Sequence, residues 1–360
     1  MKKRLYILIC AVIVAIVTVP WACLLAGTTV SANGFAVGKK ARKDLASANI
    51  RTGRLGSDDA ATGVDSLREE EEQRVDEMLH NKKLFPFGQR RVVAYAGMRY
   101  DTKGKPRLKE MISRLVDLGV NCYSYLIDAH SKEELAALPH FCDLASKARI
   151  EVWVVLVPPT EEPKPARGNH DGIRYPPYGL DYLKWARDIS VISKKHSNLT
   201  LLMIDDFLYN LKCFTPQYVA KIHKILDREN KRLLLGLTIY ANQLGRTKEI
   251  NRYEPYADAV EWGYQHKSNL SPDYGISAQS LPAEISEFWK VFPHRILIPC
   301  IYFTPHSSWS RKATSAYLKE AMTLAYNDAG VALIFRTPER GTVNYDIVKT
   351  FCHERILSSK

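Results

Sequence analysis

The feature that most constrains the fold is a regular alternation of short apolar runs with helix-like stretches, from Arg91 to Phe335. There are eight apolar runs, each about the length of a β-strand. Repeated strand–helix units predict parallel strands joined by crossover helices, and eight such units can close into a (β/α)8 TIM barrel. The predicted strands are Arg91–Ala96, Asn121–Ile127, Glu151–Val157, Thr200–Ile204, Leu233–Ile239, Ala257–Trp262, Ile296–Phe303 and Val331–Phe335.

The composition of the strands favours the barrel over other α/β folds. The runs are rich in Val, Ile and Leu, as expected for parallel strands covered on both faces. An open, doubly wound sheet is the alternative, but no predicted strand is followed by a glycine-rich phosphate-binding turn. With 360 residues, 46% of them hydrophobic, the chain can hold one barrel of about 250 residues and an N-terminal extension. We place the barrel domain at residues 64–360.

Two helix starts carry local signals. Thr215-Pro216 combines a capping residue with a first-turn proline and predicts the beginning of a helix. Ser131, followed by Glu134, matches the capping-box pattern, in which each side chain binds the other residue's backbone N–H.

The first 32 residues have the character of a targeting segment. Three basic residues, Lys2–Arg4, precede an uncharged apolar run from Leu5 to Gly27, and Val30–Ala32 supplies a small-x-small cleavage pattern. This predicts a secretory signal peptide that is cleaved after Ala32. The run is also long enough to span a bilayer, so an uncleaved membrane anchor is the alternative. Both interpretations predict an exported protein, either secreted or held in the periplasm or cell envelope.

Residues 33–63 are rich in Gly, Ala, Ser and Thr and have almost no large apolar side chains, which predicts a flexible linker. A helix is expected next, from Asp65 to Leu84. The leader holds three basic residues and no acidic ones, so the rest of the chain has a net charge of 48 − 39 = +9. Much of this excess lies in residues 39–54. It indicates either a solvated linker or adhesion to anionic envelope polymers or lipid headgroups.

The sequence predicts no cofactor and no metal site. Five cysteines follow the leader, an odd number, widely spaced and without a CxxC pair. That pattern favours neither a zinc site nor a dense disulfide framework. The chain also has no recognisable nucleic-acid-binding module.

Polar and aromatic side chains follow the predicted strands, at the ends where (β/α)8 barrels place their active sites. Sugars stack on Tyr and Trp rings while carboxyl groups act on the glycosidic oxygen, so this combination favours a carbohydrate site. Rings at these positions could instead only cover the barrel. The candidate catalytic residues are Asp205 and Asp206, and the candidate substrate-binding residues are Asp128, Tyr240, Asn242, Trp262, Tyr264 and Tyr302.

The most informative pair is Asp205-Asp206, at the end of the fourth strand. Successive residues of a regular strand point to opposite faces, so only one carboxylate would face the barrel interior. At the last residues before a loop this alternation relaxes, and both can turn toward the same pocket. Two close carboxylates repel each other, which raises one pKa and can keep an acid protonated near neutral pH. The alternative is a structural pair that caps helix N–H groups or meets basic side chains.

Four short segments stand out together, at Leu115–Tyr125, Met203–Phe207, Leu237–Tyr240 and Glu261–Gly263. They resemble segments of glycoside hydrolase family 84, which contains the O-GlcNAcases and the hyaluronidase-type N-acetylglucosaminidases. Leu115–Tyr125 is similar to the first helix and second strand of that family, and Met203–Phe207 to its strand-four Asp-Asp motif. Leu237–Tyr240 resembles a Thr-Glu-Tyr segment, and Glu261–Gly263 falls where a Trp-Thr-Gly segment is expected. The segments occur in the same order as in the family.

The resemblance implies a substrate-assisted retaining mechanism, in which the acetamido oxygen of the substrate is the nucleophile. Asp205 would orient the acetamido N–H, Asp206 would be the general acid and then the base, and Tyr240 would bind the acetamido oxygen. The chain departs from the family at two sugar-binding positions. Asp128 and its neighbours replace a strand-two lysine, and Tyr302–Pro305 replaces an Asp-Asn segment after strand seven.

Three hypotheses follow. The first is an exported glycoside hydrolase that acts on N-acetylhexosamine-containing glycans by the substrate-assisted mechanism. The second is a barrel glycosidase with a different carboxylate pair, Asp206 with Glu261. The third is a non-catalytic glycan-binding protein of the envelope.

Overall fold

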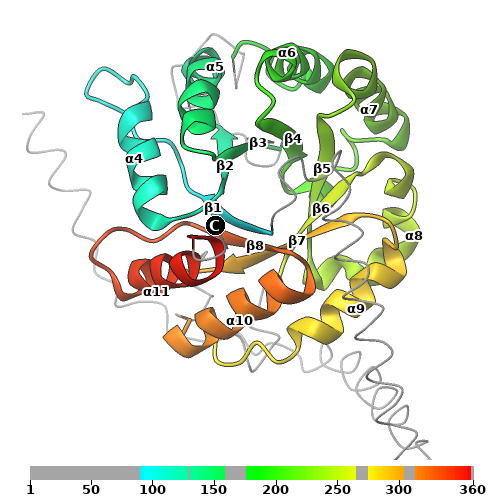
Figure 1. The fold of residues 1–360 in the computed structure, drawn as a ribbon. Coiled ribbons are helices and arrows are strands. Elements are labelled where there is room, and N and C mark those ends of the chain that lie inside the picture. The colour runs from blue at the N-terminus through cyan, green and yellow to red at the C-terminus, as the bar shows by residue number, and fades with distance from the viewer. Residues whose placement is uncertain (1–89, 129, 159–175, 265–274, 304–312, 358–360) are drawn as a thin grey trace, which may run out of the picture. The chain divides into compact units, whose positions relative to one another are not determined.

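The computed structural model describes residues 90–128, 130–158, 176–264, 275–303 and 313–357. Within these ranges the chain forms a closed barrel of eight parallel strands in the order β1 to β8, with helices outside them (Figure 1). The barrel closes where β8 pairs with β1, through partners such as Val331 with Arg91 and Phe335 with Tyr95. The predicted (β/α)8 fold is therefore confirmed. The predicted leader, linker and Asp65–Leu84 helix lie outside the described residues.

All eight predicted strands are present, with ends within two residues of the prediction. The strands are β1 Arg91–Tyr95, β2 Cys122–Ile127, β3 Glu151–Leu156, β4 Leu199–Ile204, β5 Leu234–Tyr240, β6 Ala259–Gly263, β7 Ile296–Tyr302 and β8 Val331–Phe335.

Helices follow the strands and pack around them. The α-helices are α4 Leu108–Leu118, α5 Ser131–Lys147, α6 Tyr182–Lys195, α7 Pro216–Asn230, α8 Thr247–Ile250, α9 Leu281–Val291, α10 Ser315–Asp328 and α11 Val343–Cys352. Short helical turns are η3 Phe207–Tyr209, η4 Ala241–Arg246, η5 Glu254–Tyr256 and η7 His353–Leu357. No helix among the described residues is long and apolar enough to cross a membrane.

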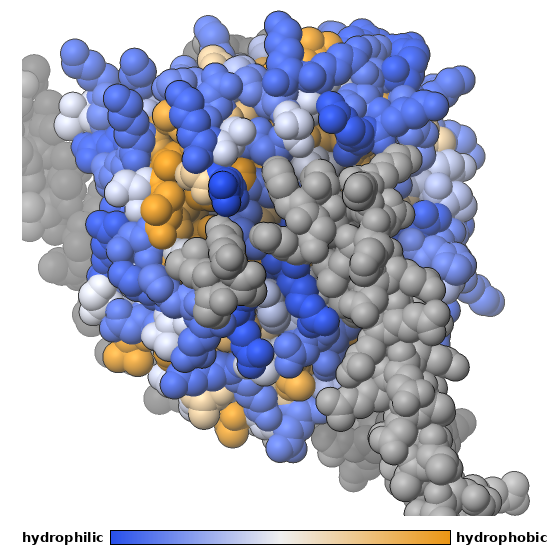
Figure 2. Space-filling view, viewed as in Figure 1, coloured by the Kyte–Doolittle hydropathy of each residue, from blue (hydrophilic) through white to orange (hydrophobic). Residues whose placement is uncertain are grey.

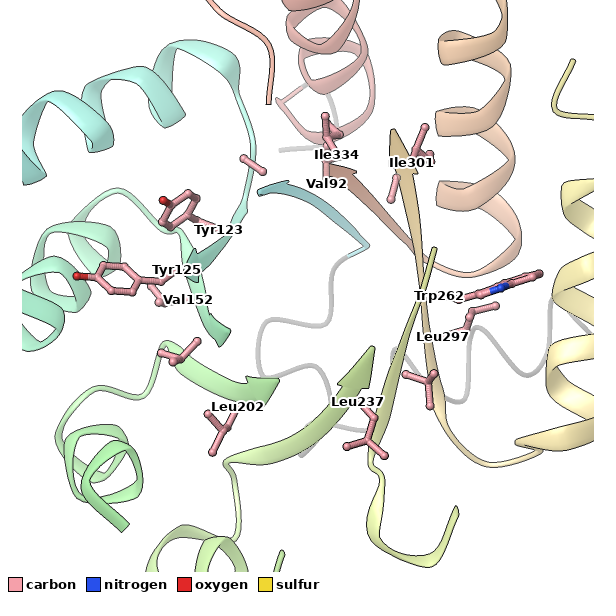
Figure 3. Packing of buried hydrophobic residues seen from close by; sticks show 14 of the residues in the cluster. Val92, Tyr123, Tyr125, Val152, Leu202, Leu237, Trp262, Leu297, Ile301 and Ile334 are labelled. Atoms are coloured by element: carbon pink, nitrogen blue, oxygen red, sulfur yellow. The ribbon is translucent and has the colours of Figure 1, made fainter. Parts of the chain in front are cut away.

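Strand alternation divides the core into two clusters. Side chains such as Val93 and Met203 point into the barrel and pack there on one another. Their neighbours Val92, Leu202 and Ile334 belong to the larger cluster between strands and helices, and Figure 3 shows them pointing away from the barrel axis. This two-sided burial explains why the strands read as continuous apolar runs in the sequence.

The base of the barrel contains a buried polar group. Arg91, the first residue of β1, donates from Nε to Oε2 of Glu151, the first residue of β3, at 2.6 Å. Trp153 Nε1 and the Thr200 hydroxyl donate to the other Glu151 oxygen. Both charged residues are almost fully buried. These contacts satisfy a carboxylate that burial would otherwise destabilise.

The helix-start signals had different outcomes. Thr215 caps α7 as predicted, since its side chain accepts a hydrogen bond from Tyr218 N and Pro216 is the first helical residue. The prediction of a capping box at Ser131 was wrong. His130 occupies the cap position, and the Ser131 hydroxyl donates to Pro176 O instead.

Candidate active site

Asp205 continues β4 toward the mouth of the barrel. Its N–H donates to Leu156 O at 3.1 Å and so extends the pairing with β3 by one residue. Its Oδ2 accepts a hydrogen bond from the Tyr95 hydroxyl, at 3.3 Å. Tyr95 points into the barrel from β1, so this contact places the Asp205 carboxylate over the barrel interior.

Asp206 turns back toward the same side because its backbone is left-handed, with φ 44° and ψ 35°. Asp is among the few non-glycine residues that tolerate this conformation. The Asp206 N–H donates to Asp205 Oδ1 at 2.8 Å, and the Asp206 carboxylate accepts from the Tyr240 hydroxyl. The structure thus brings Asp205, Asp206 and Tyr240 together at the C-terminal ends of β4 and β5.

A glycine in β6 makes room for the rings beside this pair. A Cβ on Gly263 would lie 2.5 Å from Tyr240 Cδ1 and 3.0 Å from the Tyr302 hydroxyl. Tyr302 packs on Phe335 with ring centroids 4.9 Å apart, and Phe335 packs edge-on to Tyr95 at 5.0 Å. The predicted residues Tyr240 and Tyr302 therefore belong to one aromatic lining of the barrel mouth.

Glu261 lies inside the barrel, near the acid pair. It is 3% exposed, and its Oε2 has no hydrogen-bond partner among the described residues. Burial raises the pKa of Glu261 to about 8, and the charges of Asp205 and, to a lesser extent, Asp206 add to the shift. Glu261 therefore holds its proton at neutral pH and presents a neutral acid beneath the aspartates.

Tyr95 and Tyr240, the two tyrosines that donate to the acid pair, both have a raised pKa. Burial is the larger cause for each, and the negative charge of Asp205 is the second. Both hydroxyls therefore remain protonated and act as hydrogen-bond donors over the physiological pH range.

Trp262 and Tyr264 lie elsewhere, in the layer between strands and helices, and neither is exposed. Trp262 stacks on Phe288 of α9 at 6.2 Å, and Figure 3 shows its ring directed toward that helix. Tyr264 stacks on Tyr317 of α10 at 6.4 Å, and its hydroxyl bonds Ser280 Oγ at 2.9 Å. These rings form part of the core, so we do not include them in the proposed site. Their sequence neighbours Glu261 and Gly263 are the residues of this segment that face inward.

Asp128 lies just after β2, two residues beyond Leu126, which contacts the barrel interior. Its N–H donates to Glu134 at 2.7 Å, and burial raises the pKa of its carboxyl group. Glu134 is itself buried and also accepts from the Tyr100 hydroxyl. The buried Glu134 carboxylate thus holds the backbone of Asp128 at the mouth of the barrel. The sequence had instead predicted that Glu134 would cap helix α5 together with Ser131.

Asn242 lies in η4, directly after β5, and the structure describes no more of it than its backbone. The next residue, Gln243, has a role that the sequence did not suggest. It is 3% exposed, and its Oε1 accepts from Tyr240 N at 3.0 Å, which fixes the end of β5.

The predicted absence of metal and cofactor remains a prediction. Across the described ranges, no group of three or more His, Cys, Asp or Glu residues has an arrangement that could hold a metal ion.

No protein-family model and no curated protein sequence match this chain. Among solved structures, a family 99 endo-α-mannosidase from Bacteroides thetaiotaomicron is 12% identical, with a TM-score of 0.50, over 75% of this chain and 98% of that one. A β-D-glucuronidase from Dictyoglomus thermophilum is 15% identical (TM-score 0.47), over 73% of this chain and 49% of its own length. A Bacteroides uniformis β-glucuronidase is 10% identical (TM-score 0.45), over 69% of this chain and 30% of its own.

The chain therefore spans half or less of the two glucuronidases and nearly all of the mannosidase. At 12% identity, the likeness to the mannosidase concerns the fold alone.

Proposed function

We propose that this protein is an exported glycoside hydrolase that acts on N-acetylhexosamine-containing glycans by a substrate-assisted, retaining mechanism. The observation that carries the proposal is the acid pair. Asp205 and Asp206 lie side by side at the C-terminal mouth of a TIM barrel, and each carboxylate accepts a hydrogen bond from a buried tyrosine. The sequence segments that resemble glycoside hydrolase family 84 support the same residues.

In the proposed reaction, Asp205 accepts the acetamido N–H, which increases the negative charge on the acetamido oxygen. That oxygen attacks the anomeric carbon while the bond to the leaving-group oxygen breaks, and Asp206 donates a proton to the leaving group. Asp206 then takes a proton from water, which opens the cyclic intermediate and restores the acid. Tyr95 holds Asp205 in place through its hydroxyl.

Tyr240 has two roles in this scheme. Its hydroxyl donates to Asp206 and so orients the acid. The acetamido oxygen of a bound substrate would compete for the same proton, and transfer of the hydrogen bond would free Asp206 to accept its proton for catalysis.

A second pair, Asp206 with Glu261, is favoured by one observation. Glu261 is neutral at neutral pH, because burial raises its pKa to about 8, and a protonated carboxyl group is what a general acid requires. Its burial beneath Asp205 argues against direct contact with a sugar, since it is only 3% exposed.

A screen of chromogenic glycosides, followed by inhibition with a thiazoline that mimics the cyclic intermediate, tests the proposal. Hydrolysis of N-acetylhexosaminides with thiazoline inhibition is expected. Hydrolysis that the thiazoline does not inhibit would favour the pair with Glu261. A protein that binds glycans and hydrolyses none of the panel would be a binding protein on the same barrel.

We also propose export, on the basis of the basic and apolar leader, with attachment to the membrane or envelope if the leader is retained. The expected partner is a carbohydrate and not a nucleic acid.

A further inference from the structure

Tyr209 is an exposed aromatic residue beside the acid pair. Six large hydrophobic side chains in the described part of the chain are exposed, and Tyr209, at 41%, is the aromatic one among them. The described residues on the face that Figure 2 shows are mostly hydrophilic, with a smaller group of hydrophobic residues among them. The other five are Val116, Leu180, Val191, Ile276 and Val343.

The segment that carries Tyr209 is anchored on both sides. Phe207 and Leu208, directly before it, are almost fully buried, and Phe207 stacks on Phe214 with ring centroids 5.5 Å apart. Tyr209 N donates to Asp206 O at 3.2 Å, and Asn210 Nδ2 donates to the same oxygen at 2.9 Å. The loop therefore fixes the backbone of Tyr209 relative to Asp206, so binding there would order little additional chain.

Arg246 holds this segment from another element. Its Nη1 donates to Leu208 O at 3.2 Å, and its other guanidinium nitrogens pair with Glu249. The loop after β4 is thereby tied to the helical turns that follow β5.

The aromatic side chains of the site form a series from the barrel interior to the surface. Tyr95, which donates to Asp205, is 5% exposed, and Tyr240, which donates to Asp206, is 7% exposed. Tyr209 lies against Tyr240 with ring centroids 5.8 Å apart and planes inclined at 34°. Asp205 extends β4 and accepts from Tyr95, whose ring belongs to the cluster inside the barrel. Asp206 begins the loop and accepts from Tyr240, which contacts the exposed Tyr209, so Tyr209 is the outermost of these side chains.

We propose that Tyr209 is a stacking platform for a second sugar of the glycan, on the leaving-group side of Asp206. This inference rests on the proposed function, in which Asp206 donates a proton to the leaving-group oxygen. A sugar bound over Asp205 is the deeper one, so the residue that it is linked to extends outward past Asp206. There it meets the exposed ring of Tyr209. The apolar face of a pyranose stacks on an aromatic ring, and a ring with fixed backbone supplies that contact area at small entropic loss.

The test compares two substrates that share the deeper sugar. N,N′-diacetylchitobiose has a second sugar, whereas N-acetylglucosaminyl fluoride has none. We expect Tyr209→Ala to raise the KM for the disaccharide about tenfold and to change the KM for the fluoride less than twofold. Tyr209→Phe, which keeps the ring, should behave like the unaltered protein. Val343→Ala, at an exposed position on α11, is the matched control and should change neither KM.

Other results would overturn the Tyr209 platform or separate its failure from the failure of the proposed function. An unchanged KM for the disaccharide in Tyr209→Ala, or equal losses on both substrates, would overturn the platform. If the unaltered protein hydrolyses neither substrate, the proposed function fails, and calorimetric titration with the tetrasaccharide of N-acetylglucosamine tests the platform alone. Binding that weakens in Tyr209→Ala would support it, whereas binding that is absent or insensitive to this change would overturn it.

Discussion

At the scale of single residues, the site depends on two backbone features. The left-handed conformation of Asp206 turns its carboxylate to the side of Asp205, and the missing side chain of Gly263 admits Tyr240 and Tyr302. Hydroxyls from β1 and β5 then hold one aspartate each. The strands supply rigid donors and the loop supplies the acids.

Glu261 should make the free energy of unfolding depend on pH between its ordinary pKa of 4.5 and its raised pKa of about 8. Its pKa is about 8 in the folded protein, against an ordinary value of 4.5, so the folded state binds this proton more tightly than the unfolded state. The free energy of unfolding should therefore fall as pH rises from about 4.5 to about 8, by up to about 1.4 kcal/mol per pH unit. Glu261→Gln should remove this loss and be more stable than the unaltered protein at pH 9. Urea unfolding between pH 4 and 9 measures this pH dependence of the free energy of unfolding, with Glu133→Gln at an exposed position as the control. Equal pH dependence in Glu261→Gln and the unaltered protein would contradict the assignment.

Part of the site could be predicted from the sequence. Asp205, Asp206 and Tyr240 follow directly from their positions at strand ends. The inward direction of Glu261 and the outward direction of Trp262 follow from alternation once β6 is known to end at Gly263. The exposure of Tyr209 could not be predicted, because it depends on how Phe207 and Leu208 pack in three dimensions.

At the scale of elements, the strands were predictable because burial on both faces leaves a continuous apolar signal. Local signals were less dependable. Thr215 acts alone through its own side chain and caps α7 as predicted. At Ser131 a tertiary contact took over, since Glu134 binds the end of β2 and Tyr100 instead of closing the capping box.

A histidine joins α7 to the start of β6, and its contribution to stability should also be lost as pH rises. His223 Nε2 lies 3.7 Å from Asp258 Oδ2, which also accepts from Leu235 N, and Asp258 is the main cause that raises the pKa of His223. Its stabilisation should be complete below the ordinary pKa of 6.5 and disappear as pH rises through the raised value. His223→Gln should lower the free energy of unfolding by about 0.5–1 kcal/mol at pH 5.5 and by less at pH 9. Thermal unfolding at both pH values, with the exposed His140→Gln as control, checks this. An equal loss at both would show that the charge does not matter.

At the scale of the whole molecule, the barrel domain is predicted to be independent of the leader and linker. Intact-mass measurement of the exported protein should show a chain that begins after Ala32, whereas a retained Met1 with membrane fractionation would indicate an anchor. A chain that begins at Gly63 should keep the thermal midpoint of the longer chain, because residues 33–63 have few large apolar side chains that could join a core. A midpoint lower by several degrees would show that this segment packs on the barrel.

The barrel, the paired acids and the sequence resemblance all lead to one claim, that Asp205 activates the acetamido nucleophile and Asp206 serves the leaving group. The most direct measurement is kcat/KM for Asp205→Asn and Asp206→Asn on an aryl N-acetylglucosaminide and on the disaccharide. Both variants should fold and lose about 10²–10⁴-fold on the disaccharide. Asp206→Asn should lose far less on the aryl glycoside, whose leaving group needs little protonation, while Asp205→Asn should lose as much on both. Equal losses for the two variants on both substrates, or no loss for either, would contradict the claim.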